Sequence, residues 1–261
     1  MLSITFTGGL GAQILSASAY FFLKSQNEPV RANFDYFDLA AKVAHLQTLG
    51  ITFSNKVSLF GWQLDDLGLY QSEFNTTGPE IEKIEDGIKK SQLAMNGLCS
   101  DEIRKLFLIP QRAHELKEEL FDKEAFACVH IRRGDYLEVA SYLVSDENFF
   151  DAIEAVSKLV KRLLVLSDSS LSANLADRIS SLGMKVVLGI GGNPSVGHGL
   201  MRLSDILICS NSQYSFSAAY LRDKNQLSII PSKHDSGDDP SANEYLGKIR
   251  TFQLLTKFTT T

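Results

Sequence analysis

The sequence has little cysteine and no long apolar run, and each shortage excludes a class of protein. Its three cysteines are odd in number and far apart, which argues against a disulfide framework or a paired-cysteine metal site and favours a reducing compartment, the cytoplasm. No apolar run approaches the ~20 residues of a membrane helix, and the N-terminus lacks the basic start and apolar core of a signal peptide. We therefore expect neither a transmembrane segment nor export, while peripheral attachment to a membrane stays open.

The sequence also lacks an excess of positive charge: its formal net charge is -5, and it has no block of lysine and arginine. A protein of this kind has no broad electrostatic field that attracts nucleic acid, so we expect no nucleic-acid partner. Any anionic ligand must then be bound by a local cluster of charged and polar groups.

The 261 residues are enough for two modest domains. The opening reads as a strand (Ser3 to Gly8), a helix (Gly11 to Gln26) and a second strand (Pro29 to Asp35), which is a βαβ unit and the start of a parallel sheet. From Phe53 to Cys99 the apolar residues show no clear helical or strand periodicity, so we predict no elements there. A charged helical stretch follows, and we place the boundary there, giving domains 1–115 and 116–261.

The second half alternates strands and helices much more clearly. Five apolar strand segments are separated by helical segments, which predicts a complete α/β domain with a parallel sheet. The expected strands are "AFACVHI", "RLLVLSD", "MKVVLGI", "DILICS" and "LSIIP", and the expected helices run from Glu147 to Leu159, from Ser172 to Leu182, near Leu200 and from Tyr214 to Leu221.

The first of these strands ends in "HIRRGDY", with two arginines at the end where ligands of parallel α/β sheets bind. Because side chains alternate along a strand, His130 and Arg132 share one side, and Arg133 lies on the other. One arginine can then face a ligand while its neighbour braces the domain, and Asp135 could hold either. A guanidinium fits phosphate oxygens in bidentate fashion, so a diphosphate is the natural ligand of Arg132. The alternative is a structural arginine–aspartate pair without a ligand.

A glycine turn, "TGGLGAQ", joins the first strand to the first helix, where backbone amides can face an anion or a sugar. It is not a P-loop, because no Gly-Lys-Ser/Thr follows. Gly9 and Gly11 fit the first two glycines of a dinucleotide fingerprint, but Ile14 stands at the third. Because Asp35 ends the second strand, a nicotinamide site stays an alternative.

A polar segment follows the fourth strand of the second domain and starts a helix. N-capping needs one short polar residue, whereas this segment offers five in six positions, which favours a ligand site at the helix start. They are Ser210, Asn211, Ser212, Gln213 and Ser215.

Taken in order, these segments resemble the bacterial α-1,2-fucosyltransferase family and its wider inverting fucosyltransferase group. That family has a Gly-Gly-Leu-Gly-Asn-Gln opening, a central His-x-Arg-Arg-Gly-Asp-Tyr and a late Asn-Ser-Ser-Phe-Ser-Trp-Trp-Gly-Ala-Tyr-Leu. Here they read "GGLGAQ", "HIRRGDY" and "NSQYSFSAAYL", and "VLSDS" is similar to the family's Phe-Ser-Asp-Asp segment. The central motif is intact and the most specific.

The resemblance implies the GT-B architecture, in which two Rossmann-like domains flank a cleft, with the acceptor on the N-terminal side and the nucleotide-sugar donor on the C-terminal side. It also implies inverting transfer of L-fucose from GDP-fucose to a glycan hydroxyl, α-1,2 to galactose, without a divalent metal or other cofactor. The absence of an Asp-x-Asp motif agrees with metal independence.

The resemblance also suggests roles for individual residues. Arg132 would stabilise the charge that grows on the leaving phosphate, with His130 beside it contacting donor or acceptor. The general base would be Asp135, Glu138 or Asp35, among which the sequence does not choose. The donor-binding residues would be Gly9, Gly11, Gln13, Arg132, Asp168, Asn211, Ser212, Gln213 and Ser215.

The chain departs from the family's motifs at several positions. Ala12 replaces the asparagine of the opening, and Gln213, Phe216 and Ser217 replace Ser, Trp and Trp in the late segment. Two alternatives to a fucosyltransferase therefore remain: a non-catalytic nucleotide-sugar binding protein, and an NAD-dependent oxidoreductase.

Overall fold

The computed structural model describes residues 1–33, 82–84, 88–138, 142–190, 192–223, 226–231 and 252–254. The chain divides into two units, Met1–Leu108 and Ile109–Thr261. The boundary predicted between residues 115 and 116 would cut helix α6 (Gln111–Phe121), which lies wholly in the second unit.

The first unit contains a parallel three-stranded sheet in the order β2-β1-β3. The main helices α1 and α4 approach each other closely, because a Cβ at Gly97 of α4 would lie 2.2 Å from the carbonyl oxygen of Ser18 in α1. The elements are β1 (Leu2–Thr5), α1 (Leu10–Ser25), β2 (Val30–Asn33), β3 (Glu82–Ile84), α4 (Ile88–Cys99) and α5 (Asp101–Arg104).

The second unit is built on a six-stranded sheet in the order β6-β5-β4-β7-β8-β9. All neighbouring strands are parallel except β8 and β9. The elements after α6 are β4 (Ala127–Ile131), the 3-10 helix η2 (Gly134–Glu138), α7 (Asp146–Ser157), β5 (Arg162–Ser167), α8 (Ala173–Ser181), β6 (Lys185–Ile190), α9 (Pro194–Leu203), β7 (Ile206–Ile208), α10 (Gln213–Leu221), β8 (Leu227–Pro231) and β9 (Phe252–Leu254).

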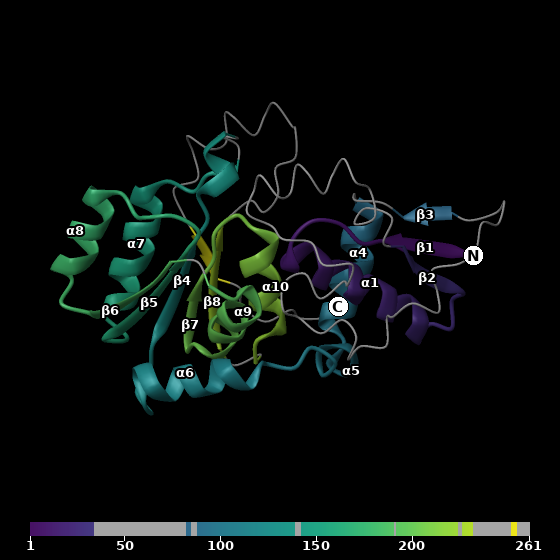
Figure 1. Ribbon diagram of the computed structural model, residues 1–261, viewed down its shortest axis with the longest axis horizontal. Coiled ribbons are helices and arrows are strands. Elements are labelled where there is room, and N and C mark those ends of the chain that lie inside the picture. The colour runs from purple at the N-terminus through teal and green to yellow at the C-terminus, as the bar shows by residue number, and fades with distance from the viewer. Residues whose placement is uncertain are drawn as a thin grey trace. The chain divides into compact units, whose positions relative to one another are not determined.

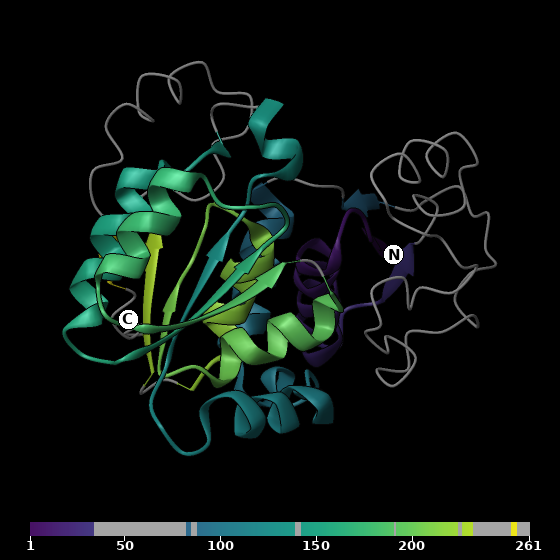
Figure 2. The same cartoon turned by 60° about the vertical axis from the view of Figure 1, so that its left-hand side comes forward.

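Helices cover both faces of this sheet, as Figures 1 and 2 show. On one face, Ala127, Val129 and Ile131 of β4 pack in a core shared with α7 and α8. On the other face, Cys128 of β4 packs in a core shared with α6, α9 and α10. Burial on both faces explains why the strand sequences are continuous apolar runs.

Short polar residues cap the free amides at the starts of helices α7 to α10, whereas α6 follows Pro110 without a side-chain cap. The Ser145 hydroxyl accepts from the Asn148 amide at 3.2 Å, and the Ser172 hydroxyl accepts from the Leu175 amide at 3.2 Å. The helices therefore start close to where the sequence predicts them.

The prediction of an α/β fold with five parallel strands in the second domain is confirmed. Five described elements were not predicted: β3, α4, α5, the 3-10 helix η2 and the antiparallel strand β9. Cys99, Cys128 and Cys209 are free thiols, and burial raises the pKa of Cys209 to about 12. In the described ranges, no helix has both the length and the apolar content to cross a membrane.

Candidate functional site

The strand order of the second unit defines where a ligand site is expected. The chain adds β5 and β6 on one side of β4 and then returns to add β7 on the other side. The strand order therefore reverses between the neighbouring strands β4 and β7. In open α/β sheets, ligands bind beyond the carboxyl ends of the strands at this switch point. The segments at the carboxyl ends of β4 and β7 are "RRGD" and "SNSQ", the two that the sequence singles out.

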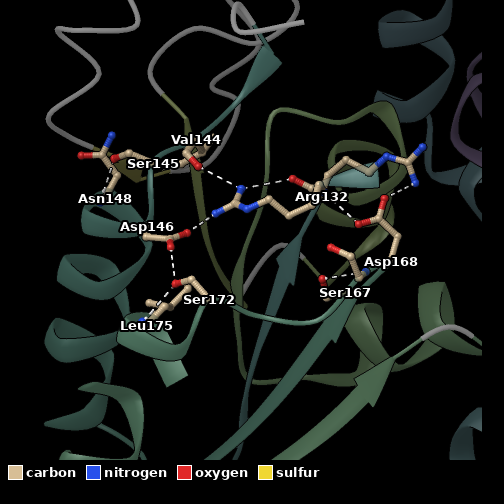
Figure 3. Close-up of polar contacts among 11 residues, drawn as sticks. Arg132, Val144, Ser145, Asp146, Asn148, Ser167, Asp168, Ser172 and Leu175 are labelled. Atoms are coloured by element: carbon tan, nitrogen blue, oxygen red, sulfur yellow. Dashed lines mark hydrogen bonds and ion pairs between the residues drawn. The ribbon is translucent and has the colours of Figure 1, made fainter. Parts of the chain in front are cut away.

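The Arg132 guanidinium lies beyond the end of β4 and is held by the carboxylate at the end of β5. Arg132 Nη1 is 2.7 Å from Asp168 Oδ2, and Asp168 Oδ1 accepts a hydrogen bond of 2.8 Å from the Arg133 amide. The Arg132 side chain is 34% exposed, and its guanidinium carbon lies 5.3 Å from the centre of the Tyr136 ring. Figure 3 shows the pairing of Arg132 with Asp168. A partly exposed, oriented guanidinium of this kind suits an anionic ligand.

Gly134 is required by this arrangement. Its φ is +25°, and a Cβ there would lie 2.6 Å from Asp168 Oδ2. Glycine therefore lets the chain turn while the Asp168 carboxylate approaches the backbone.

Arg133 points to the opposite side and braces the domain. Its Nη2 pairs with Asp146 at the start of α7, and its Nη1 donates to the Val144 carbonyl at 3.0 Å. Asp146 also accepts from the Ser172 hydroxyl at 2.5 Å, which links α7 to the cap of α8 (Figure 3). The Arg133 side chain is only 12% exposed and lies against the Phe149 ring. The carboxylates described beside the two arginines are thus Asp168 and Asp146, while the prediction that Asp135 holds one of them stays a prediction because its side chain is not described.

The His130 side chain is buried beneath the site instead of facing a ligand. It is 5% exposed, its Nδ1 lies 2.8 Å from the Ser210 hydroxyl, and its ring is edge-on to Tyr214. Burial, and to a lesser degree the charge of Arg132, lower the pKa of His130 to about 3. A neutral, enclosed imidazole is poorly placed for the predicted contact with donor or acceptor. Its geometry is that of a residue that positions the end of β4.

We expect this burial to make the stability of the protein depend on pH. The folded-state pKa of His130 is depressed, so its contribution is fully present above the unfolded value of about 6.5 and is lost as pH falls towards 3. At pH 5 the loss should be about 2 kcal/mol. Urea unfolding of His130→Asn should therefore show a flatter dependence on pH between 7 and 5 than the wild type.

The matched control is His114→Asn, since His114 is exposed on α6. This variant should keep the wild-type slope. Equal slopes in wild type and His130→Asn would contradict the burial of a neutral His130.

Most of the polar side chains at the start of α10 form hydrogen bonds within the second unit or are buried in it. The Ser212 hydroxyl caps the helix by accepting from the Tyr214 amide at 3.3 Å. The Ser215 hydroxyl is fully buried and donates to the Ser210 carbonyl at 3.2 Å. Asn211 is also buried, whereas Gln213 is half-buried. Among these four predicted donor-binding residues, Gln213 has the most exposed side chain.

In the first unit, the glycine turn is shaped by its own hydrogen bonds. Gly8 has a φ of +63°, Gly9 occupies the N-cap position of α1, and the buried Gln13 side chain donates to the Gly8 carbonyl at 3.1 Å. Gly11 is buried in the first turn of α1, and Ile14 is completely buried in the position of the third glycine of a dinucleotide fingerprint. The predicted contribution of Gly9, Gly11 and Gln13 to a ligand site stays a prediction.

The predicted general bases have no described side chains. Asp135 and Glu138 lie in η2, directly after the arginine pair, and only their backbone is described. Asp35 lies outside the described residues. No group of three or more metal-ligating side chains occurs in the part of the chain that was described.

The structure adds site residues that sequence reasoning missed. Asp146 holds Arg133, the Tyr214 ring packs against His130, and His198 packs against Tyr214. These contacts join segments far apart in the chain, so no local motif indicates them. The one available signal was the position of Asp146 just before a predicted helix.

Comparison with known proteins yields a family and a fold. The family described as "Glycosyl transferase family 11" matches residues 92–246. POFUT1 in complex with GDP is 11% identical, with 85% of this chain and 94% of that chain covered and a TM-score of 0.51. The apo form of POFUT1 is 12% identical, with 88% and 97% covered and a TM-score of 0.50. No curated protein matches the chain.

The likeness to POFUT1 extends over most of both chains and shows a shared fold. The predicted fold class, α/β of the GT-B type with two Rossmann-like units, is confirmed.

Proposed function

Because the chain belongs to glycosyl transferase family 11, we propose that it is an inverting fucosyltransferase that moves L-fucose from GDP-fucose to a hydroxyl of a glycan. We further propose that the acceptor is galactose, that the linkage is α-1,2 and that no divalent metal is needed. The solved structures that share its fold include POFUT1 in complex with GDP, which is consistent with a donor that carries GDP.

The observation that carries the proposal is the oriented guanidinium of Arg132. It lies at the switch point of the sheet, is partly exposed and is held by Asp168. In the reaction, the acceptor oxygen forms a bond to the fucose C1 as the bond from C1 to the β-phosphate oxygen breaks, and GDP leaves with the electron pair. A preorganised cation beside the diphosphate stabilises this charge and supplies what a metal supplies in other transferases.

Other residues of the site have supporting roles in the proposal. Both oxygens of Asp168 are engaged, with the Arg132 guanidinium and the Arg133 amide, which favours a role in aiming Arg132. The acceptor proton passes to a carboxylate, with Asp135, Glu138 and Asp35 as the candidates. Gln213 and the backbone at the start of α10 are proposed to meet the donor, with Asn211, Ser212 and Ser215 shaping that turn.

The test is to incubate the protein with GDP-fucose and a panel of galactosides and to measure GDP release with and without EDTA. Acceptor-dependent release that survives EDTA is expected, and mapping the product by NMR would identify the linkage. GDP binding without release would indicate a non-catalytic binding protein. Binding of NAD with no response to GDP would indicate the oxidoreductase.

A further inference from the structure

We propose that Tyr214 is a positioning residue for donor binding, which fixes the first turn of α9 to the first turn of α10 beside the end of β4. The proposal rests on the function proposed above. It assigns a role to a phenol hydroxyl that takes no part in the chemical step.

Tyr214 joins three elements of the second unit. It is the second residue of α10, and its hydroxyl donates a hydrogen bond of 2.5 Å to the carbonyl of Pro194, the first residue of α9. Its ring packs against two buried imidazoles, with centroid distances of 5.1 Å to His130 of β4 and 5.6 Å to His198 of α9. The position of this one ring is therefore coupled to the end of β4 and to the starts of both helices.

A second hydrogen bond joins the same two helices. His198 Nε2 lies 3.1 Å from the Ser217 hydroxyl, and both side chains are buried. The motif that α10 resembles has phenylalanine at the position of Tyr214 and tryptophan at that of Ser217. The two hydroxyls that bond α10 to α9 thus stand at positions where this chain departs from that motif.

The Tyr214 hydroxyl lies close to the backbone of Gly197 in α9. A Cβ at Gly197 would lie 2.8 Å from this oxygen. Glycine at position 197 therefore lets α9 approach the phenol closely enough for the bond to Pro194.

The two helix starts matter for the donor because of where they lie in the fold. α9 follows β6 and α10 follows β7, so both begin at the carboxyl edge of the sheet, the edge at which Arg132 follows β4. A nucleotide diphosphate bound at Arg132 extends along this edge. A hydrogen bond between the two helix starts holds the surface that the nucleotide contacts in place before binding. The free-energy cost of ordering this surface on binding is then lower.

Tyr214→Phe removes the hydroxyl and keeps the ring that packs against the two imidazoles. Titration with GDP should show an affinity about 10-fold weaker than that of the wild type, in line with the loss of one buried hydrogen bond. Assays with GDP-fucose should show KM raised by a similar factor and kcat changed by less than about 2-fold, because the hydroxyl acts on binding and not on the chemical step. Tyr220→Phe, at the other end of α10, is the control and should bind GDP like the wild type.

Gly197→Ala gives an independent test. The added methyl group should displace the phenol and weaken GDP binding, whereas Gly197→Ala combined with Tyr214→Phe should bind no worse than Tyr214→Phe alone, since the colliding oxygen is gone. Unchanged GDP affinity in Tyr214→Phe, or additive losses in the double variant, would overturn the proposal. If wild-type protein fails to bind GDP, the proposed function fails instead, so the two failures are distinguishable.

Discussion

Arg132→Lys is expected to reduce fucosyl transfer at least ~100-fold while the protein stays folded. Lysine keeps the positive charge but lacks the planar guanidinium, whose several N–H donors can bond to Asp168 and to phosphate oxygens at the same time. Because the guanidinium is partly exposed and bonded at one edge to Asp168, its replacement should leave the core intact. Initial rates of GDP release at saturating GDP-fucose, with circular dichroism as a check of folding, measure the effect.

Arg133→Lys is the matched control, since it makes the same change one residue along the chain. Arg133 is nearly buried and bonds to Asp146 and the Val144 carbonyl, so its replacement should lower the melting temperature more than that of Arg132. The folded fraction should retain most of its turnover. If the folded Arg133 variant loses more turnover than the Arg132 variant, the assignment of faces to the two arginines is wrong.

Arg222→Met should lower the free energy of unfolding by about 3 kcal/mol, the largest effect on stability that we expect. Arg222 is 3% exposed, and its guanidinium donates to the carbonyl oxygens of Met201 in the last turn of α9 and of Ser204 and Asp205 before β7. Burial lowers the pKa of Arg222 to about 10, so the side chain stays protonated at neutral pH. Methionine fills the volume but removes the charged donor from all three oxygens. The Met201 and Ser204 carbonyls keep a second donor, from the Ser204 hydroxyl and from Gln226 Nε2, whereas the Asp205 carbonyl loses its bond to Arg222. Urea unfolding at pH 7 measures the loss.

The control for this variant is Arg112→Met on α6. Arg112 is half-exposed and pairs with Glu119 and Glu115 on the surface of its own helix, where ion pairs contribute little. We expect a change within about 0.5 kcal/mol for this control. A loss below about 1 kcal/mol for Arg222→Met would show that the buried guanidinium does not stabilise the segment between α9 and β7.

The five parallel strands of the second unit could be predicted because they are apolar runs bounded by turn residues, most clearly β4, which is buried along its whole length. Alternation along β4 also predicted that the two arginines face opposite sides, and the structure places Arg133 against Asp146 and Arg132 against Asp168. Local periodicity is enough for such conclusions, because they concern residues adjacent in the chain.

The partners of these residues could not be predicted, because they depend on strand order. His130 bonds to Ser210 only because β4 and β7 are neighbours, and 80 residues separate the two. The same holds for Asp168, which reaches Arg132 across the β4–β5 pair. The sequence therefore singled out the segments at the carboxyl ends of β4 and β7, but it predicted a ligand contact for His130, whose side chain the structure buries.

The elements missed in the first unit have a different cause. Helix α4 has polar residues mixed among its apolar ones, and one of them, Lys90, is buried with its ammonium group donating to the Thr5 carbonyl at 2.6 Å. A buried lysine breaks the amphipathic pattern by which a helix is found. Strand β3 is only three residues long, too short for a period to be visible.

The most direct test of the account is a calorimetric titration of the wild type and of Arg132→Lys with GDP and with GMP. The two nucleotides differ by the β-phosphate, the group that Arg132 is proposed to bind. We predict that the wild type binds GDP at least ~10-fold more tightly than GMP and that Arg132→Lys loses most of this difference. Equal affinity of the wild type for the two nucleotides, or a preference for GDP that survives in Arg132→Lys, would contradict the account.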